Sequence, residues 1–173
     1  WIKDPNLWIN QSQWGRARLF LSQLCEIFGG WTIEQVSQPP KEMEIKDPLE
    51  GLPLALGKDF GDYKERRDEL LAKGKVWFEK LVALWRSEPW IYPLAFEKGR
   101  IFFVDSQEFK VGSTTIRFSP PLFHGVEFGK LGWVISMVLE CQGTKILYSS
   151  DLQGPIIEDY ADWIIKENPD LLI

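Results

Sequence analysis

The amino-acid sequence predicts an α+β fold, with helices in the first half of the chain and mainly strands in the second. Two stretches, residues 10–28 and 62–86, repeat apolar side chains at three- and four-residue steps, which is the periodicity of a helix with one buried face. From residue 99 the pattern changes to short apolar runs separated by turn residues, which is typical of strands. The 173 residues suffice for one domain with a sizeable core.

Residues 10–28 form the clearest predicted helix. Asn10 can cap its first turn, and Gln13 stands three residues later at the capping-box position. A Gly-Gly pair follows and supplies a left-handed stop. The predicted buried face consists of Trp14, Ala17, Leu21, Leu24, Cys25 and Phe28.

The next region combines a long connection with a second helix. Residues 35–61 contain many Pro and Gly, which predicts a connection without regular structure, with residues 49–56 packed down as an extended segment. Long loops often act as lids, so this connection is a candidate lid. The helix predicted over residues 62–86 uses Asp62 as its cap. Its apolar stripe is Leu70, Trp77, Leu81, Leu84 and Trp85.

The strands of the second half are predicted from turn signals. Residues 108–111 and 114–118 form one hairpin. A long strand over 131–140 is followed by a Gln-Gly turn and an antiparallel return over 144–149. The other expected elements are a strand over 100–104, a helix over 156–167 with Tyr160, Ala161, Ile164 and Ile165 inward, and a buried strand at the end of the chain.

Composition and charge exclude several classes of function. The net charge of −5 makes a general nucleic-acid binder unlikely without excluding a locally basic site. No run of about 18 apolar residues exists, so no membrane span is expected. Cys25 and Cys141 lie far apart, which argues against a disulfide framework and against a cysteine-rich zinc site. With no signal-peptide pattern, these features predict a cytoplasmic protein.

The two ends of the chain predict a segment of a longer protein. The chain begins at Trp1 rather than at a methionine, and its last residues read as the start of a buried strand. The sequence contains one histidine, so a complete multi-histidine metal site cannot come from these residues alone.

His124 is the first candidate functional residue. It follows a predicted strand and a Pro-Pro pair that restricts the backbone, and it precedes Gly125, which permits close approach. Loops at strand ends often carry functional side chains, and a neutral imidazole is the commonest metal ligand. The alternative is a structural histidine bonded to a backbone carbonyl.

Asp151 is the second candidate. It follows the predicted strand over 144–149, and a carboxylate in such a position can bind or bridge metal ions. The alternative is an N-cap for the helix predicted over 156–167, because Asp favours that role.

The remaining motifs are weaker evidence for a function. The segment from Gly125 to Leu131 mimics a phosphate-binding loop but has the wrong spacing, and no Ser or Thr follows its lysine. The nine tryptophans are expected mainly in the core. Trp85, Trp90 and Tyr92 are close enough in sequence to form one apolar patch, which is a candidate interface for a homo-oligomer.

Several segments together resemble an uncharacterised prokaryotic family of predicted metal-dependent hydrolases within the metallo-β-lactamase superfamily. The start of the first helix, Asn10-Gln11-Ser12-Gln13, is similar to that family's Asn-x-Ser-Gln motif. The likeness is dense over residues 99–173 and sparse over 1–28, and residues 31–92 look like a helical insertion. The denser segments are Thr115–Gly125, Lys130–Ile135, Ser149–Pro155, Ala161–Ile165 and Asn168–Ile173.

The resemblance implies an αββα sandwich, of which this chain is the C-terminal part. It implies a divalent metal, zinc with iron or manganese as alternatives, with His124 and Asp151 among the ligands. A metal-bound hydroxide would then attack a small-molecule ester, thioester or phosphoester. The loops that carry the ligands would be supported by Pro121, Gly125, Ser150, Gln153 and Gly154.

One departure from the superfamily pattern leaves a second hypothesis open. The signature His-x-His-x-Asp-His is absent from these residues, and two ligands do not complete a zinc site. The missing ligands would lie before Trp1 and after Ile173. The alternative is a non-catalytic module of the same fold that binds a partner through its aromatic-rich insertion.

Overall fold

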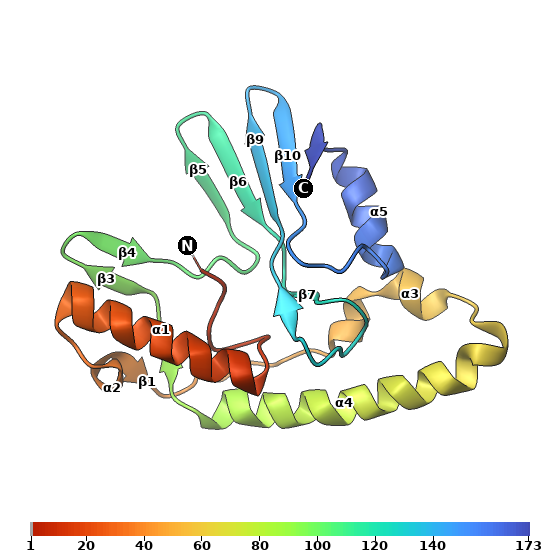
Figure 1. Ribbon diagram of the computed structural model, residues 1–173, viewed down its shortest axis with the longest axis horizontal. Coiled ribbons are helices and arrows are strands. Elements are labelled where there is room, and N and C mark those ends of the chain that lie inside the picture. Colours follow the sequence, from red (N-terminus) through yellow and green to blue (C-terminus); the bar gives the residue numbers. More distant parts are fainter. Residues whose placement is uncertain (1) are drawn as a thin grey trace.

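The computed structural model describes residues 2–173 and confirms a mixed α+β architecture with several small sheets (Figure 1). Its largest sheet has the strand order β11-β10-β9-β6-β5, in which only the β10–β11 pair is parallel. These strands are β5 (Glu108–Val111), β6 (Thr114–Phe118), β9 (Met137–Cys141), β10 (Thr144–Tyr148) and β11 (Leu171–Leu172).

Within residues 2–173, three two-stranded pairs and five α-helices accompany the large sheet. The pairs are β1 (Ser37–Gln38) with β2 (Trp90–Ile91), β3 (Leu94–Phe96) with β4 (Gly99–Ile101), and β7 (Leu122–Phe123) with β8 (Trp133–Val134). The helices are α1 (Gln11–Gly29), α2 (Ile33–Val36), α3 (Pro53–Gly57), α4 (Lys64–Ser87) and α5 (Glu158–Glu167), with 3₁₀ turns η1 (Pro48–Gly51) and η2 (Gly61–Tyr63). No helix among the described residues is long and apolar enough to cross a membrane.

The first helix forms as predicted. Asn10 caps α1, and the capping box with Gln13 is complete. Gly30 ends the helix in the left-handed conformation, at φ 65°. Cys25 is fully buried, which confirms it as a core residue, whereas Phe28 is 56% exposed and the prediction of its burial is wrong.

The long connection is more structured than predicted. The segment expected to be extended over 49–56 forms η1 and α3 instead. Asp62 does not cap α4, because it lies within η2 and the N-cap position is occupied by Tyr63 without a side-chain bond. The short α3 is capped from a distance, since the Asp159 carboxylate accepts hydrogen bonds from the backbone N–H groups of Leu54 and Ala55 at 3.0 and 2.9 Å.

In the second half, both predicted hairpins are confirmed, as β5–β6 and β9–β10. The single long strand expected over 131–140 is wrong, because it is divided into β8 and β9. Ile165 points outward and is 74% exposed, and the terminal strand lies at a sheet edge, with Leu171 49% exposed, rather than buried.

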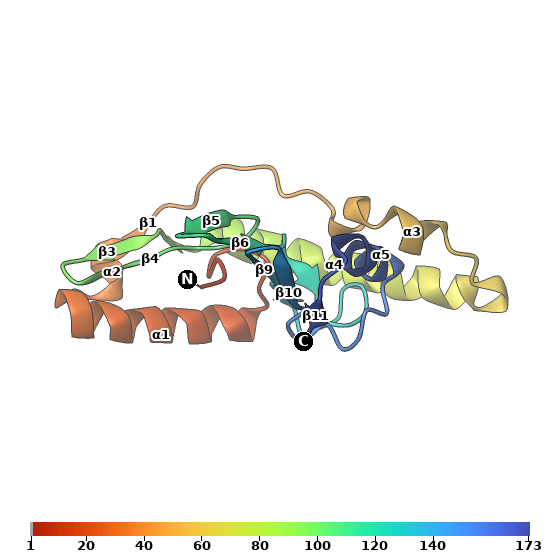
Figure 2. The ribbon, with the colours of Figure 1, turned by 90° about the horizontal axis from the view of Figure 1, so that it is seen from above.

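The core joins the helical and β-rich parts of the chain. Phe78 and Trp85 of α4 belong to the same buried cluster as Val138 and Leu147 of the large sheet. The predicted apolar surface patch at Trp85, Trp90 and Tyr92 is wrong, because the two tryptophans are 0% and 5% exposed. Seen from above, α5 lies on one side of the large sheet and α1 on the other (Figure 2).

An ion pair fixes the end of α5 to the sheet. Arg117 on β6 donates two hydrogen bonds of 2.8 Å to the Glu167 carboxylate, which holds the pKa of Glu167 below its ordinary 4.5. This pair therefore stabilises the fold above about pH 4.5, and the stabilisation is lost as the pH falls through the lowered pKa.

We expect Glu167→Gln to lower the free energy of unfolding by about 1 kcal/mol at pH 7, an amount limited by the partial exposure of Arg117. Urea unfolding at several pH values measures this, and the difference from the parent should shrink at acid pH. Asp162, whose side chain is 41% exposed and paired with the exposed Lys166, offers the control Asp162→Asn, which should change little at any pH. A Glu167→Gln effect that is equally large at acid pH would contradict the ionic origin.

Candidate metal-binding site after β7 and β10

A local irregularity of the sheet positions His124. Pairing between β6 and β9 ends at Phe118 opposite Met137 and resumes with Leu122 opposite Val134. Three residues therefore stand on one strand against two on the other, and two of the three are prolines, which cannot donate to a ladder. The bend displaces β7 and β8 from the large sheet and places His124 directly after β7.

Asp151 lies in the loop between β10 and α5. Its neighbours Ser150, Gln153 and Gly154 adopt positive φ angles of 61°, 59° and 77°, so the chain turns tightly around the carboxylate. The helix that follows begins at Glu158 with Ile157 at the N-cap position. The alternative reading of Asp151 as an N-cap is therefore wrong.

The structure brings the two predicted residues together. His124 Nε2 lies 3.1 Å from Asp151 Oδ2, although the residues are in different loops. The side-chain amide nitrogen of Gln153 lies 2.7 Å from Asp151 Oδ1 and 3.1 Å from His124 Nε2. His124 is 15% exposed at its side chain and Asp151 64%, so the pair faces solvent from one side.

This geometry fits a shared cation. If the Gln153 amide donates to both neighbours, His124 Nε2 is unprotonated, and two acceptor atoms then stand 3.1 Å apart. Such a pair needs a proton or a cation between its members. A nitrogen and an oxygen bound to one tetrahedral zinc at about 2.0–2.2 Å are themselves separated by about 3.4 Å, which is close to the observed distance.

The described residues do not form a complete metal site by themselves. No group of three or more His, Cys, Asp or Glu side chains that could hold a metal gathers among residues 2–173. The donor types suit zinc, iron or manganese, but further ligands would have to come from outside these residues.

The predicted supporting residues occupy the two loops. Gly125 has φ 87°, and a Cβ there would touch the Gln153 side chain at 3.7 Å, so the glycine serves backbone conformation more than space. Pro121 is half-buried at the bend before β7. The backbone N–H of His124 donates to Gly132 O at 3.0 Å and closes the loop that follows.

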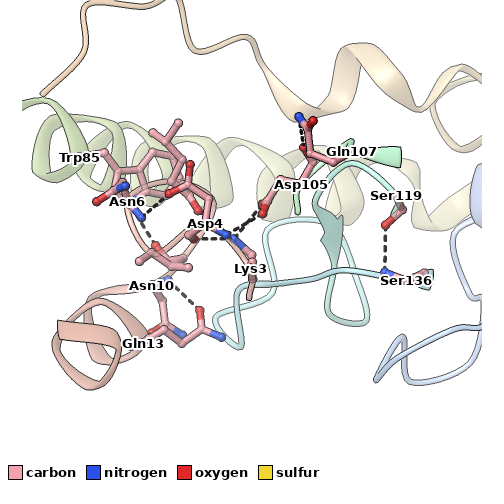
Figure 3. A network of polar contacts seen from close by, with 12 residues as sticks. Lys3, Asp4, Asn6, Asn10, Gln13, Trp85, Asp105, Gln107, Ser119 and Ser136 are labelled. Atoms are coloured by element: carbon pink, nitrogen blue, oxygen red, sulfur yellow. Dashed lines mark hydrogen bonds and ion pairs between the residues drawn. The ribbon is translucent and has the colours of Figure 1, made fainter. Parts of the chain in front are cut away.

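Contacts that sequence reasoning missed hold the His124 loop in place. The Asn10 side chain, besides capping α1, donates to the carbonyls of Lys130 and Leu131 at 3.0 and 3.3 Å. Gly132 lies so close to Gln13 that a Cβ would stand 2.5 Å from Gln13 Oε1. Figure 3 shows Asn10 and Gln13 beside this part of the chain. The first turn of α1, which the sequence predicts only as a capped helix start, therefore also anchors the loop after His124.

The long helix α4 is docked to the same loop through Gly74. An added Cβ at Gly74 would lie 2.4 Å from Cβ of Phe128, which is buried. The only sequence signal for this contact is a glycine in a helix interior, where glycine costs about 1 kcal/mol relative to Ala.

We expect Gly74→Ala to destabilise the protein by about 1–2 kcal/mol, since overpacking outweighs the gain in helix propensity. The matched control is Gly15→Ala in α1, where nothing lies within 4 Å of the added Cβ and a small gain in stability is expected. Urea unfolding of both variants measures the difference. A stabilised Gly74→Ala variant would show that the Phe128 contact is loose.

A separate group of half-buried charges has a structural role. Lys3 lies 3.5 Å from the Asp105 carboxylate and donates to Leu7 O, and the Asp105 carboxylate accepts from the backbone N–H of Asp4 at 2.6 Å (Figure 3). Burial lowers the pKa of Lys3 and raises that of Asp4. Together with the Ile2–Phe103 bridge, these contacts fix the first described residues to the strand region.

Comparison with known proteins finds archaeal relatives. The chain is 49% identical over 74 residues to a UPF0282 protein of Pyrococcus horikoshii, which is 42% of this chain and 24% of that relative. It is 43% identical over 74 residues to a UPF0282 protein of Methanocaldococcus jannaschii, covering 43% and 25%, and 37% identical over 71 residues to one of Methanopyrus kandleri, covering 41% and 24%. The matched part spans about a quarter of the length of these relatives. No family model and no solved structure matches the chain.

Proposed function

We propose that this chain contributes two ligands, His124 and Asp151, to the metal centre of a hydrolase with the metallo-β-lactamase fold. The observation that carries the proposal is the 3.1 Å approach of His124 Nε2 to Asp151 Oδ2 from two separate loops. Neither the composition nor the hairpin pattern requires these loops to meet, so their convergence is independent support for a pair selected from sequence.

The faces of the large sheet support the αββα part of the proposal. One face carries Arg117, Val138 and Leu147 and packs on α5 through the Glu167 ion pair and the shared core. The strand register places apolar side chains on the opposite face, and four of them are between 47% and 62% exposed: Val111, Tyr148, Leu171 and Ile173. A second sheet packed against this face would bury them, as in a sandwich.

The residues of this chain would bind and orient the metal. His124 supplies a neutral nitrogen, Asp151 a carboxylate oxygen, and Gln153 holds both side chains in position by contacting each of them. A bound divalent cation would supply a water molecule of lowered pKa as the nucleophile. The substrate class is an ester, thioester or phosphoester.

Elemental analysis of the full gene product after dialysis tests the proposal. One to two equivalents of zinc, iron or manganese per chain are expected. A folded protein that holds no metal, and takes up none when zinc is added back, would overturn it. That result would favour the non-catalytic partner-binding module, with His124 and Asp151 as a structural pair.

A further inference from the structure

A cavity of about 330 Å³ lies beside the two loops that carry His124 and Asp151. Its walls come from the segment of residues 58–71, from the loop after β7 and from the loop before α5. The volume is at the lower end of the range for small-molecule pockets, about 300–1,000 Å³.

Apolar side chains from all three segments converge on this cavity. Four of them are between 45% and 58% exposed although they face the same space: Tyr63, Leu70, Val126 and Ile156. Ile157, which also lines it, is 2% exposed and belongs to the main core. Apolar groups that a folded chain leaves accessible around one hollow favour an apolar occupant.

The cations that line the cavity are already paired. Arg67 forms an ion pair of 2.7 Å with Glu127, both side chains being nearly buried, and its guanidinium lies 4.3 Å from the centre of the Phe60 ring. Lys58 pairs with Glu158. With both positive charges neutralised by carboxylates that also line the cavity, a phosphate or other anion finds no unpaired cation there.

The cavity lies only a few residues along the chain from the candidate site. Val126 follows His124 by two residues, so their Cα atoms are at most about 7 Å apart. Ile156 follows Asp151 by five residues, which allows at most about 18 Å. The cavity therefore lies within reach of the acyl or alkyl part of a small substrate whose reacting group is bound between His124 and Asp151.

We propose that this cavity binds the uncharged apolar part, an alkyl or aryl group, of the substrate that is hydrolysed beside His124 and Asp151. The inference rests on the proposed function and narrows its substrate class to esters, thioesters or phosphoesters that carry an apolar alkyl or aryl group. It also gives the segment of residues 58–71 a role, as one wall of the substrate pocket.

Binding of N-phenyl-1-naphthylamine, a neutral apolar fluorescent probe, tests the cavity in the full gene product without requiring turnover. Val126→Glu and Leu70→Glu place a charge in the cavity at partly exposed positions, and each should weaken probe binding at least about 10-fold. Leu19→Glu is the matched control, because Leu19 is 64% exposed on α1 and does not line the cavity. The probe affinity of this variant should equal that of the parent. Binding that is absent, or unaffected by the two cavity variants, would overturn the inference.

A kinetic comparison tests the link to the reaction. Hydrolysis of 4-nitrophenyl octanoate consumes one water and releases 4-nitrophenol and octanoic acid. Its kcat/KM should exceed that of 4-nitrophenyl acetate about 10-fold or more, and Val126→Glu should remove this preference while metal content stays unchanged. A preference for the acetate, or one that Val126→Glu does not change, would overturn the substrate assignment. The two proposals fail separately: a protein that binds the probe but no metal would support the apolar cavity and contradict the proposed hydrolase.

Discussion

Replacing His124 with Ala or Asp151 with Asn is expected to lower the zinc affinity of the full gene product by at least about 100-fold, because outer-shell partners of a metal already contribute 10- to 100-fold and these residues are proposed as direct ligands. Dialysis against a zinc buffer followed by elemental analysis measures this loss. His124→Ala removes the ring nitrogen that lies 3.1 Å from Asp151 Oδ2, and Asp151→Asn replaces the charged carboxylate by a neutral amide, which is a weaker metal ligand.

Two comparisons make this result specific. Asp162→Asn removes a carboxylate from α5 that pairs with Lys166 and lies apart from both loops, and it should leave zinc affinity unchanged. The urea midpoints of His124→Ala and Asp151→Asn should stay close to the parent's in the absence of metal. Full zinc occupancy in both variants would contradict the ligand assignment, whatever the metal content of the parent.

Trp85→Ala is expected to cost about 3–5 kcal/mol of unfolding free energy, the range for deleting a fully buried tryptophan. Trp85 is 0% exposed, its indole N–H donates to Ile9 O at 3.1 Å, and its ring lies against Trp8 and Trp133. The substitution removes both this bond and the ring contacts of Trp85 with Trp8 and Trp133. Urea or thermal unfolding measures the loss.

Trp31→Ala is the matched aromatic control. Trp31 is 37% exposed and stacks on Phe96, so its removal should cost clearly less than that of the fully buried Trp85. If Trp85→Ala cost no more than Trp31→Ala, residues 31–92 would be a detachable insertion rather than part of the core.

Local features of the sequence determined the elements whose stability is local. The capping box at Asn10 and Gln13 and the glycine stop fix α1, and the turn residues fix the β5–β6 and β9–β10 hairpins, because each depends on atoms a few residues apart. His124 and Asp151 were found in the same way, as polar residues that follow predicted strands beside turn-forming neighbours.

Other elements depended on partners that are distant in sequence. The short α3 is capped by Asp159, about 100 residues away, and the strand expected over 131–140 is divided where Ser119 and Ser136 bond to each other. Trp85 and Trp90 resembled a surface patch because apolar residues alone do not reveal which of them become core. The spacing of apolar residues and the capping of a helix are local properties, whereas the burial of a side chain depends on how all the elements pack together.

Local residue patterns thus predicted the α+β class and the hairpins and selected the two candidate ligands. The packing of distant segments sets the 3.1 Å distance between His124 Nε2 and Asp151 Oδ2, the contacts of Gln153 with both residues, and the anchoring of the His124 loop to two helices through Asn10 and Gly74. The reason is physical. A loop takes its conformation from contacts that form only when segments distant in sequence pack together, and a local residue pattern contains no information on the distances between those segments.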